Sequence, residues 1–152
     1  MELILVMVVI GAVLGLSAPS LRGFFASRQT ADAAATMLSL TKLARSQAVA
    51  QANLCRLNID PQARTYWLTV QQAGSHVTLG SEMGRCFQLP EGATVSLQSD
   101  SLDPAASYVQ FYPTGRCDVA TIEVRGRQGD VYLITCPSAT EPFRVLRPWE
   151  VP

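Results

Sequence analysis

A chain of 152 residues is long enough for one domain with a modest hydrophobic core, but not for two full ones. Its 12 basic and 12 acidic residues cancel, so the overall charge gives no sign of a nucleic acid or another polyanion as partner. The charges are unevenly spread, because the segment from Leu3 to Leu21 contains none.

The uncharged run Leu3–Leu21 has the length of a membrane-spanning helix, which needs roughly 20 mostly apolar residues. Its Val, Ile and Leu side chains favour strands in water, but an open strand in lipid leaves backbone groups unpaired, so a helix is expected. Gly11 and Gly15 place small residues one turn apart, which lets a second helix approach closely. Pro19 removes one backbone donor and is expected to kink or loosen the helix.

This first segment has three competing interpretations. A cleaved signal peptide would have a basic start and a small-x-small exit, whereas the start is acidic and Leu16-Ser17-Ala18 is a loose match. An ordinary membrane anchor would place Arg22 and Arg28 in the cytoplasm, together with the body of the protein. The third interpretation is a helix that assembles beside a partner subunit. It explains Glu2, because an ionised carboxylate beside a membrane-length apolar run is costly unless it meets a cation.

The segment from Glu2 to Phe25 resembles the N-terminal helix of type IV pilins and pseudopilins, in which a glutamate opens a long apolar helix. Glu2 precedes Pro19 by 17 residues, which is the family spacing. The resemblance implies that Glu2 pairs with the N-terminal amine of a neighbouring subunit, and that Gly11, Gly15 and Pro19 belong to the same assembly helix. It also implies prepilin peptidase as a partner, with cleavage and N-methylation, if the full-length precursor has a leader.

Residues 22–53 are expected to continue the same helix, because this segment lacks proline and is rich in alanine. At about 1.5 Å per residue, about 50 residues would span roughly 75 Å. Residues 1–21 would lie in the membrane or the filament core, and residues 22–53 would pack on a head formed by residues 54–152. Apolar side chains recur every three or four residues as a single stripe, formed by Ala33, Met37, Leu40, Ala44, Ala48 and Ala52.

Beyond Asn53 the helical period gives way to short strands separated by Gly, Pro, Ser and Asp. Leu54–Asp60 and Thr65–Val70 are predicted to form a hairpin around a turn at Asp60-Pro61. The predicted fold class is therefore α+β, a long N-terminal helix packed on an antiparallel β-rich head. Further strands are expected at His76–Leu79, Arg85–Leu89, Ala93–Leu97, Tyr108–Tyr112, Ala120–Arg125, Val131–Cys136 and Phe143–Leu146.

The C-terminal stretch carries a second resemblance. Phe111-Tyr-Pro-Thr-Gly115 is followed by a hairpin with strands at Ala120–Val124 and Val131–Ile134. This combination is similar to the head of the GspH/FimT group of minor pseudopilins, found in type II secretion pseudopili and in some type IV pili. The resemblance implies a minor pseudopilin that crosses the bacterial inner membrane once, has a periplasmic head, and contacts other pseudopilins at a filament tip.

Four cysteines are dispersed along the head, and no two form a C-x-x-C pair. Such a set favours disulfides in an oxidising compartment; free buried thiols remain an alternative, and zinc is disfavoured because local ligand pairs are missing. A two-residue turn at Gly126-Arg127 would set Cys117 opposite Cys136, with Cβ atoms about 4.5–5.5 Å apart, close to disulfide geometry. We therefore expect Cys117–Cys136 and Cys55–Cys86, one of the connectivities that four cysteines allow.

No residues have the spacing of a catalytic centre, so no enzyme activity, cofactor or metal is expected. His76, the single histidine, is interpreted as a surface residue, and no nucleophile elbow, phosphate loop or dinucleotide fingerprint occurs. A third class of function is a solute-binding head carried by a membrane anchor that is unrelated to pilins. The main alternative is DNA binding and uptake, as associated with FimT-like minor pilins. Its candidate contacts are Arg125, Arg127, Arg144 and Arg147, although acids balance them.

Overall fold

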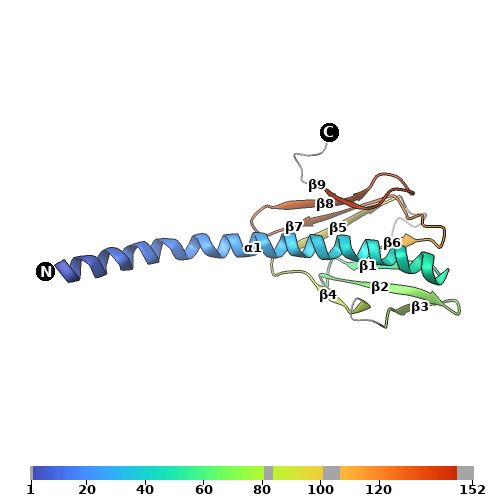
Figure 1. Ribbon diagram of the computed structural model, residues 1–152, viewed down its shortest axis with the longest axis horizontal. Helices are drawn as coiled ribbons and strands as arrows, with labels where there is room; N and C mark the ends of the chain where they lie inside the picture. Colours follow the sequence, from blue (N-terminus) through green and yellow to red (C-terminus); the bar gives the residue numbers. More distant parts are fainter. Residues whose placement is uncertain (1, 81–83, 101–106, 147–152) are drawn as a thin grey trace.

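The computed structural model describes residues 2–80, 84–100 and 107–146, with the backbone alone at Glu2 and at residues 14–22. Figure 1 shows one long helix, α1 (Glu2–Gln51), whose second half lies on a β-rich head while its first half extends away from it. The fold is α+β, with the helix packed on antiparallel sheets as predicted.

Helix α1 continues through position 19, so the proline does not end it. It ends at Gln51, and Ala52 then takes a left-handed backbone conformation with φ 52°, a common way for a helix to stop. Ala52 is exposed, so the prediction that it belongs to the packed stripe was wrong and the stripe ends at Ala48. Among the described residues, no helix is both long enough and apolar enough to cross a membrane.

The described part of the head contains two antiparallel sheets, and each strand falls on a predicted segment. The first sheet has the order β3-β2-β1-β6, with β4 also paired to β2, and the second has the order β5-β7-β8-β9. The strands are β1 (Cys55–Asp60), β2 (Thr65–Gln72), β3 (Ser75–Thr78), β4 (Phe87–Gln88), β5 (Thr94–Ser99), β6 (Tyr108–Phe111), β7 (Ala120–Arg125), β8 (Val131–Cys136) and β9 (Arg144–Leu146).

The β1–β2 hairpin forms where it was predicted, and Asp60 lies opposite Thr65. The side chain of Asp60 fixes the turn, because its Oδ1 accepts hydrogen bonds from the backbone N–H groups of Gln62 and Ala63, both at 2.9 Å. The connection between β7 and β8 differs from the prediction. Arg125 pairs with Val131, so residues 126–130 form the loop in place of a two-residue turn.

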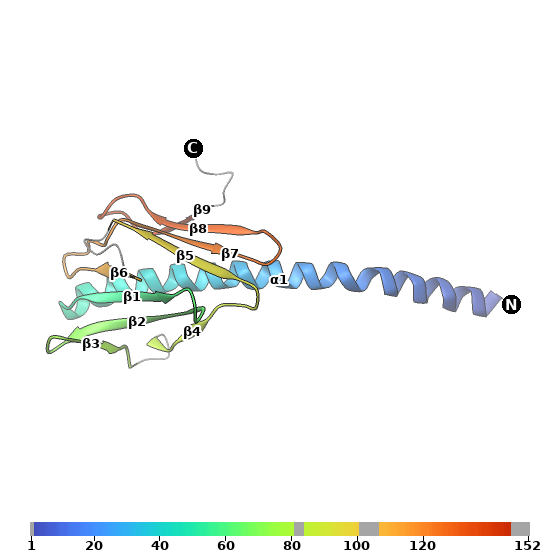
Figure 2. The same cartoon turned by 180° about the vertical axis from the view of Figure 1, so that it is seen from behind.

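The core lies between the second half of α1 and the inner faces of both sheets. In Figure 2 the view is from behind, and the strands of the two sheets lie in front of the helix that they share. Ala33, Met37, Leu40, Ala44 and Ala48 of the predicted stripe are all buried. Alternate strand residues face them, in keeping with the period of two along a strand; the fully buried ones include Leu57, Ile59, Leu68, Val109, Phe111, Ile122, Val124 and Ile134.

Candidate assembly surface

The first half of α1 presents a contiguous apolar surface. Every side chain from Leu3 to Val13 is exposed, and the large apolar ones range from 49% exposed at Ile10 to 74% at Leu3. This half projects away from the head (Figure 1), so the head does not cover it. Scattered exposed hydrophobic residues are ordinary, but a continuous apolar surface of this length is typical of an interface.

The predicted assembly residues lie along this half of the helix. Gly11 is on its exposed part, where a Cβ atom would meet no other atom within 4 Å. Glu2, Gly15 and Pro19 also lie in α1, but the described part of the structure gives only their backbone. The roles assigned to these four residues therefore stay predictions.

Two aromatic residues that the sequence reasoning did not assign mark the junction between helix and head. Phe24 and Phe25 are 62% and 60% exposed, and their rings meet edge to face with centroids 6.2 Å apart. Steps of three or four residues back from Ala33 reach Thr30 and Ala26, so the packed stripe of α1 passes neither phenylalanine. That spacing is the sequence signal that could have identified both of them as exposed.

The β7–β8 loop contacts the helix beside this junction. A Cβ atom at Gly126 would lie only 2.6 Å from Oγ1 of Thr30, so the loop can touch the helix only because residue 126 is glycine. Two turns closer to the N-terminus of α1, the side chain of Gln128 lies 3.8 Å from the position that a Cβ of Gly23 would take. The loop thus holds the head against the helix at the end of the covered half that adjoins the exposed first half of α1.

The Phe111-x-Pro113-x-Gly115 element builds the turn between the two sheets. The N–H of Gly115 donates to the carbonyl of Tyr112, and the N–H of Tyr112 donates to the carbonyl of Arg116, both at 2.9 Å. Gly115 has φ 79°, which glycine adopts without strain. The element therefore has a structural role, which is to send the chain from β6 of the first sheet toward β7 of the second.

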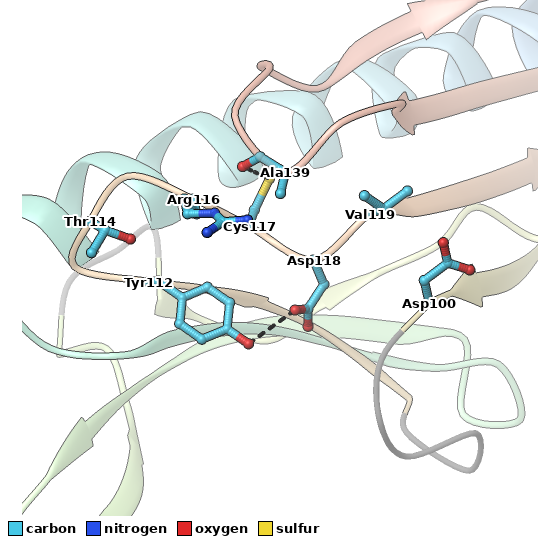
Figure 3. A pocket seen from close by; sticks show the side chains of 8 residues that line it. All are labelled: Asp100, Tyr112, Thr114, Arg116, Cys117, Asp118, Val119 and Ala139. Atoms are coloured by element: carbon cyan, nitrogen blue, oxygen red, sulfur yellow. Dashed lines mark hydrogen bonds between the residues drawn. The ribbon is translucent and has the colours of Figure 1, made fainter.

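A pocket of about 470 Å³ lies beside this turn (Figure 3). Both carboxylate oxygens of Asp118 are engaged by the protein, because Oδ1 accepts from the hydroxyl of Tyr112 and Oδ2 from the N–H of Gln110, each at 3.1 Å. Among the described residues, no group of three or more His, Cys, Asp and Glu side chains could hold a metal ion. The pocket is lined by Asp100, Tyr112, Thr114, Arg116, Cys117, Asp118, Val119 and Ala139.

Cys117 and Cys136 lie together in the core, with their Sγ atoms 3.3 Å apart. The route to this contact differs from the prediction, since Ala120 and not Cys117 lies opposite Cys136 on the β7–β8 ladder. Cys117 reaches its neighbour through a bend in which its N–H donates to the carbonyl of Ala139 at 2.9 Å. Burial, followed by the hydrogen bond to Cys136, raises the pKa of the Cys117 thiol to about 12.

The predicted pairing of Cys55 with Cys86 was wrong. Cys55 is buried on β1 opposite Val70, whereas Cys86 is exposed and precedes β4, where Phe87 lies opposite Tyr66. The two cysteines are thus separated by β2 and by several residues along it, on the order of 10 Å at about 3.3 Å per residue. A disulfide needs Cα atoms within about 7 Å, so these two are not partners. All four cysteines are free thiols in this structure.

Arg45 fastens the C-terminal loop to the helix. Its Nη1 donates to the carbonyl of Glu141 at 2.8 Å and its Nη2 to that of Thr140 at 2.6 Å. This contact was missed from the sequence, because its acceptors are backbone carbonyls, which every residue carries. The same loop lies over the cysteine pair, since the thiol of Cys136 donates to the carbonyl of Ser138 at 2.9 Å.

The arginines proposed for DNA contact do not form one described cluster. Arg125 lies opposite Val131 and Arg144 opposite Thr135, so they sit at opposite ends of β8, about 13 Å apart along the strand. Arg125 is paired with Glu123 at 2.7 Å. Arg127 is exposed in the β7–β8 loop, and Arg147 lies outside the described residues.

Comparison with protein families identifies the chain. The family model described as "Type II transport protein GspH" matches residues 33–140, which include the packed half of the helix and nearly all of the head. The chain belongs to the GspH family. It is a type II secretion protein of the minor-pseudopilin kind, and the resemblance drawn from the sequence is confirmed. A comparison with curated protein sequences gives no significant match.

Solved structures of related proteins share the fold of this chain. The crystal structure of the minor pseudopilin EpsH from the Vibrio cholerae type II secretion system has a TM-score of 0.69 at 14% identity, covering 83% of this chain and 99% of that one. The solution structure of E. coli GspH has a TM-score of 0.61 at 11% identity, covering 80% and 90%. The Pseudomonas aeruginosa type IV minor pilin FimU has a TM-score of 0.52 at 19% identity, covering 81% and 91%.

Membership in the GspH family indicates, in general terms, where the protein is located and with what it assembles. These proteins are periplasmic pseudopilus components anchored in the inner membrane, and they assemble with other pseudopilins. The family is structural, and the Phe111–Gly115 turn, the Asp118 contacts and the Arg45 contacts all act within the protein.

Proposed function

We propose that this GspH family member joins the tip of a periplasmic pseudopilus through the first half of α1, which crosses the inner membrane once and carries the head on the periplasmic side. The observation that carries the proposal is the exposed run Leu3–Val13, an apolar helical surface that the head leaves uncovered. Lipid covers such a surface in the free subunit, and the helices of neighbouring pseudopilins cover it in the filament.

Glu2 makes assembly with a neighbouring subunit more favourable than remaining alone in the bilayer. A carboxylate next to lipid is poorly solvated, so pairing with a cationic N-terminal amine of a neighbouring subunit recovers part of the desolvation cost. The subunit is then more stable beside a partner than alone in the bilayer. Gly11 supports close approach because the helix has no side chain there.

Co-purification from membranes tests the proposal. The full chain is co-expressed with the other pseudopilins of its system and is cross-linked in membranes, as the original sequence and as Glu2→Ala. We expect Glu2→Ala to lower the cross-linked yield at least about tenfold, the factor that corresponds to losing about 1.4 kcal/mol. Asp32→Ala is the matched control, because Asp32 is an exposed acid on the half of α1 that carries the head. Equal loss in both variants, or in neither, contradicts the role of Glu2.

DNA binding makes a different prediction for the same protein. A phosphate-binding surface weakens steeply with salt, because counterions are released on binding. We expect no salt-dependent gel shift, since Arg125 is paired with Glu123 and lies at the far end of β8 from Arg144. A shift that is strong at low salt and is reduced by Arg125→Gln with Arg127→Gln would favour the DNA alternative.

A further inference from the structure

We propose that Cys117 and Cys136 form a disulfide when the chain folds under oxidising conditions, and that this bond ties the two sheets of the head together. Their Sγ atoms are 3.3 Å apart, and closing the distance to about 2.05 Å takes small rotations about the side-chain bonds. Both side chains are buried, at 2% and 0% exposed, so they face one another without competing solvent.

The position of the pair makes the bond a link between the sheets. Cys117 forms an isolated β-bridge with Phe111, the last residue of β6 in the first sheet. Cys136 is the last residue of β8 in the second sheet. A bond between them joins these two sheets at the end of the head that carries the Gly115 turn.

The surrounding loop tolerates the loss of both S–H groups. Three carbonyls lie near the sulfur atoms, and each has a second donor. Ser138 accepts from the N–H of Glu141 at 3.0 Å, and Ala139 from the N–H of Cys117 at 2.9 Å. The carbonyl of Glu141 accepts from Arg45 at 2.8 Å. Oxidation therefore leaves none of these three acceptors unpaired, so burial does not oppose the bond.

The chemistry balances with a disulfide-bearing oxidant. One cysteine thiolate attacks the oxidant and forms a mixed disulfide, releasing one oxidant thiol. The second cysteine then attacks the first, forms the Cys117–Cys136 bond and releases the second oxidant thiol. The two cysteines together give up two electrons and two protons, and the oxidant becomes a dithiol.

Burial determines the stage of folding at which the Cys117–Cys136 bond can form. The pKa of Cys117 in the folded, reduced chain is about 12, so the thiol is protonated near neutral pH and is a poor nucleophile. In the unfolded chain both cysteines are accessible, and the pKa of Cys117 returns toward its ordinary value. The bond therefore forms during folding, before the Arg45 contacts close the loop over the pair.

Peptide mapping of the refolded full chain tests the proposal directly. The reduced protein is unfolded in guanidinium, refolded in detergent with a mixture of reduced and oxidised glutathione, and then digested with trypsin without reduction. Cleavage at the arginines separates the peptide Cys117–Arg125 from Gln128–Arg144, and neither contains another cysteine. We expect these two peptides to be linked in most of the protein. Alkylation in denaturant should then find two thiols, Cys55 and Cys86.

Two results overturn the proposal. One is four alkylated thiols after refolding, and the other is a linked peptide that contains Cys55 or Cys86. Thermal unfolding adds a functional readout, in which reduction lowers the Tm of the refolded chain by about 10 °C. The Cys86→Ser variant should show the same drop on reduction. Cys117→Ser with Cys136→Ser should show none, and a drop of equal size in that variant also counts against the bond.

Discussion

Both halves of α1 carry an apolar surface, but they build it from different side chains for different purposes. From Leu3 to Val13 the large side chains are at least 49% exposed, whereas from Ala33 to Ala48 the buried positions are mostly alanine. Alanine lets the helix backbone approach two sheets closely, which bulkier side chains would prevent. The second half is therefore shaped for a partner in its own chain, and the first half carries the bulky side chains that can interdigitate with other helices.

Two matched leucine substitutions give the largest expected difference between these halves. Leu40 is 1% exposed and Leu5 is 68% exposed. Leu40→Ala leaves a cavity, so we expect the free energy of unfolding of the head to fall by about 2–5 kcal/mol. Leu5→Ala should change it by less than about 0.5 kcal/mol. Urea unfolding in detergent, followed by tryptophan fluorescence, measures both, and similar losses would show that the head covers the first half of the helix as well.

Gly126→Ala tests the point at which the covered half begins. The new Cβ would lie 2.6 Å from Oγ1 of Thr30, so the loop must move away, at a cost of about 1–3 kcal/mol. Gly11→Ala is the control, because a Cβ there meets no atom within 4 Å. In a double-mutant cycle, Thr30→Ala should recover part of the loss. Without such coupling, the loop does not rest on Thr30.

Arg45→Gln sharpens the comparison at the other end of the covered half. The substitution removes two hydrogen bonds to loop carbonyls, and we expect a loss of about 1 kcal/mol together with faster hydrogen exchange in residues 137–141. Lys42→Gln changes an exposed charge on the same helix and should leave both quantities unchanged. Unaltered exchange in Arg45→Gln would mean that the loop is held by the strands alone.

The smallest expected effect depends on how completely the phenol of Tyr66 is shielded from water, and it appears only at high pH. Burial raises the pKa of Tyr66 from 10.0 to about 12, so the unfolded chain releases this proton first as the pH rises. The free energy of unfolding should therefore fall between pH 10 and pH 12, by about 1 kcal/mol at pH 11, and Tyr66→Phe should lack this part of the decline. Because the pKa of Cys55 is also raised, the informative quantity is the difference between the two proteins at each pH. Parallel curves would indicate a solvated phenol.

Local pattern predicted the elements of this fold because each has a clear period. The helix, the β1–β2 hairpin and every other described strand follow from apolar spacing and turn residues. The β7–β8 register could not be predicted in the same way. Gly126-Arg127 has the composition of a two-residue turn, but Gly129 takes φ 86° and the N–H of Gly126 donates to Asp130, which makes a longer loop.

Contacts between distant segments were predicted only when they follow from adjacent strands. Cys117 and Cys136 flank one hairpin, so they meet even though the expected register was wrong. The Cys55–Cys86 pairing depended on the order of strands, and β4 pairs with β2 and not with β1. The resemblance to type IV pilins and pseudopilins supplied the proposed roles of Glu2 and of the exposed helix, which periodicity alone could not assign.

Helix α1 has no break between its free and covered halves, so it transmits rotation from one to the other. An α-helix turns by about 100° and rises by about 1.5 Å for each residue. One residue inserted near the junction would therefore rotate the whole head by about 100° about the axis of α1, while both packing surfaces kept their composition. The orientation of the head about the helix axis is therefore set by the number of residues between the two halves.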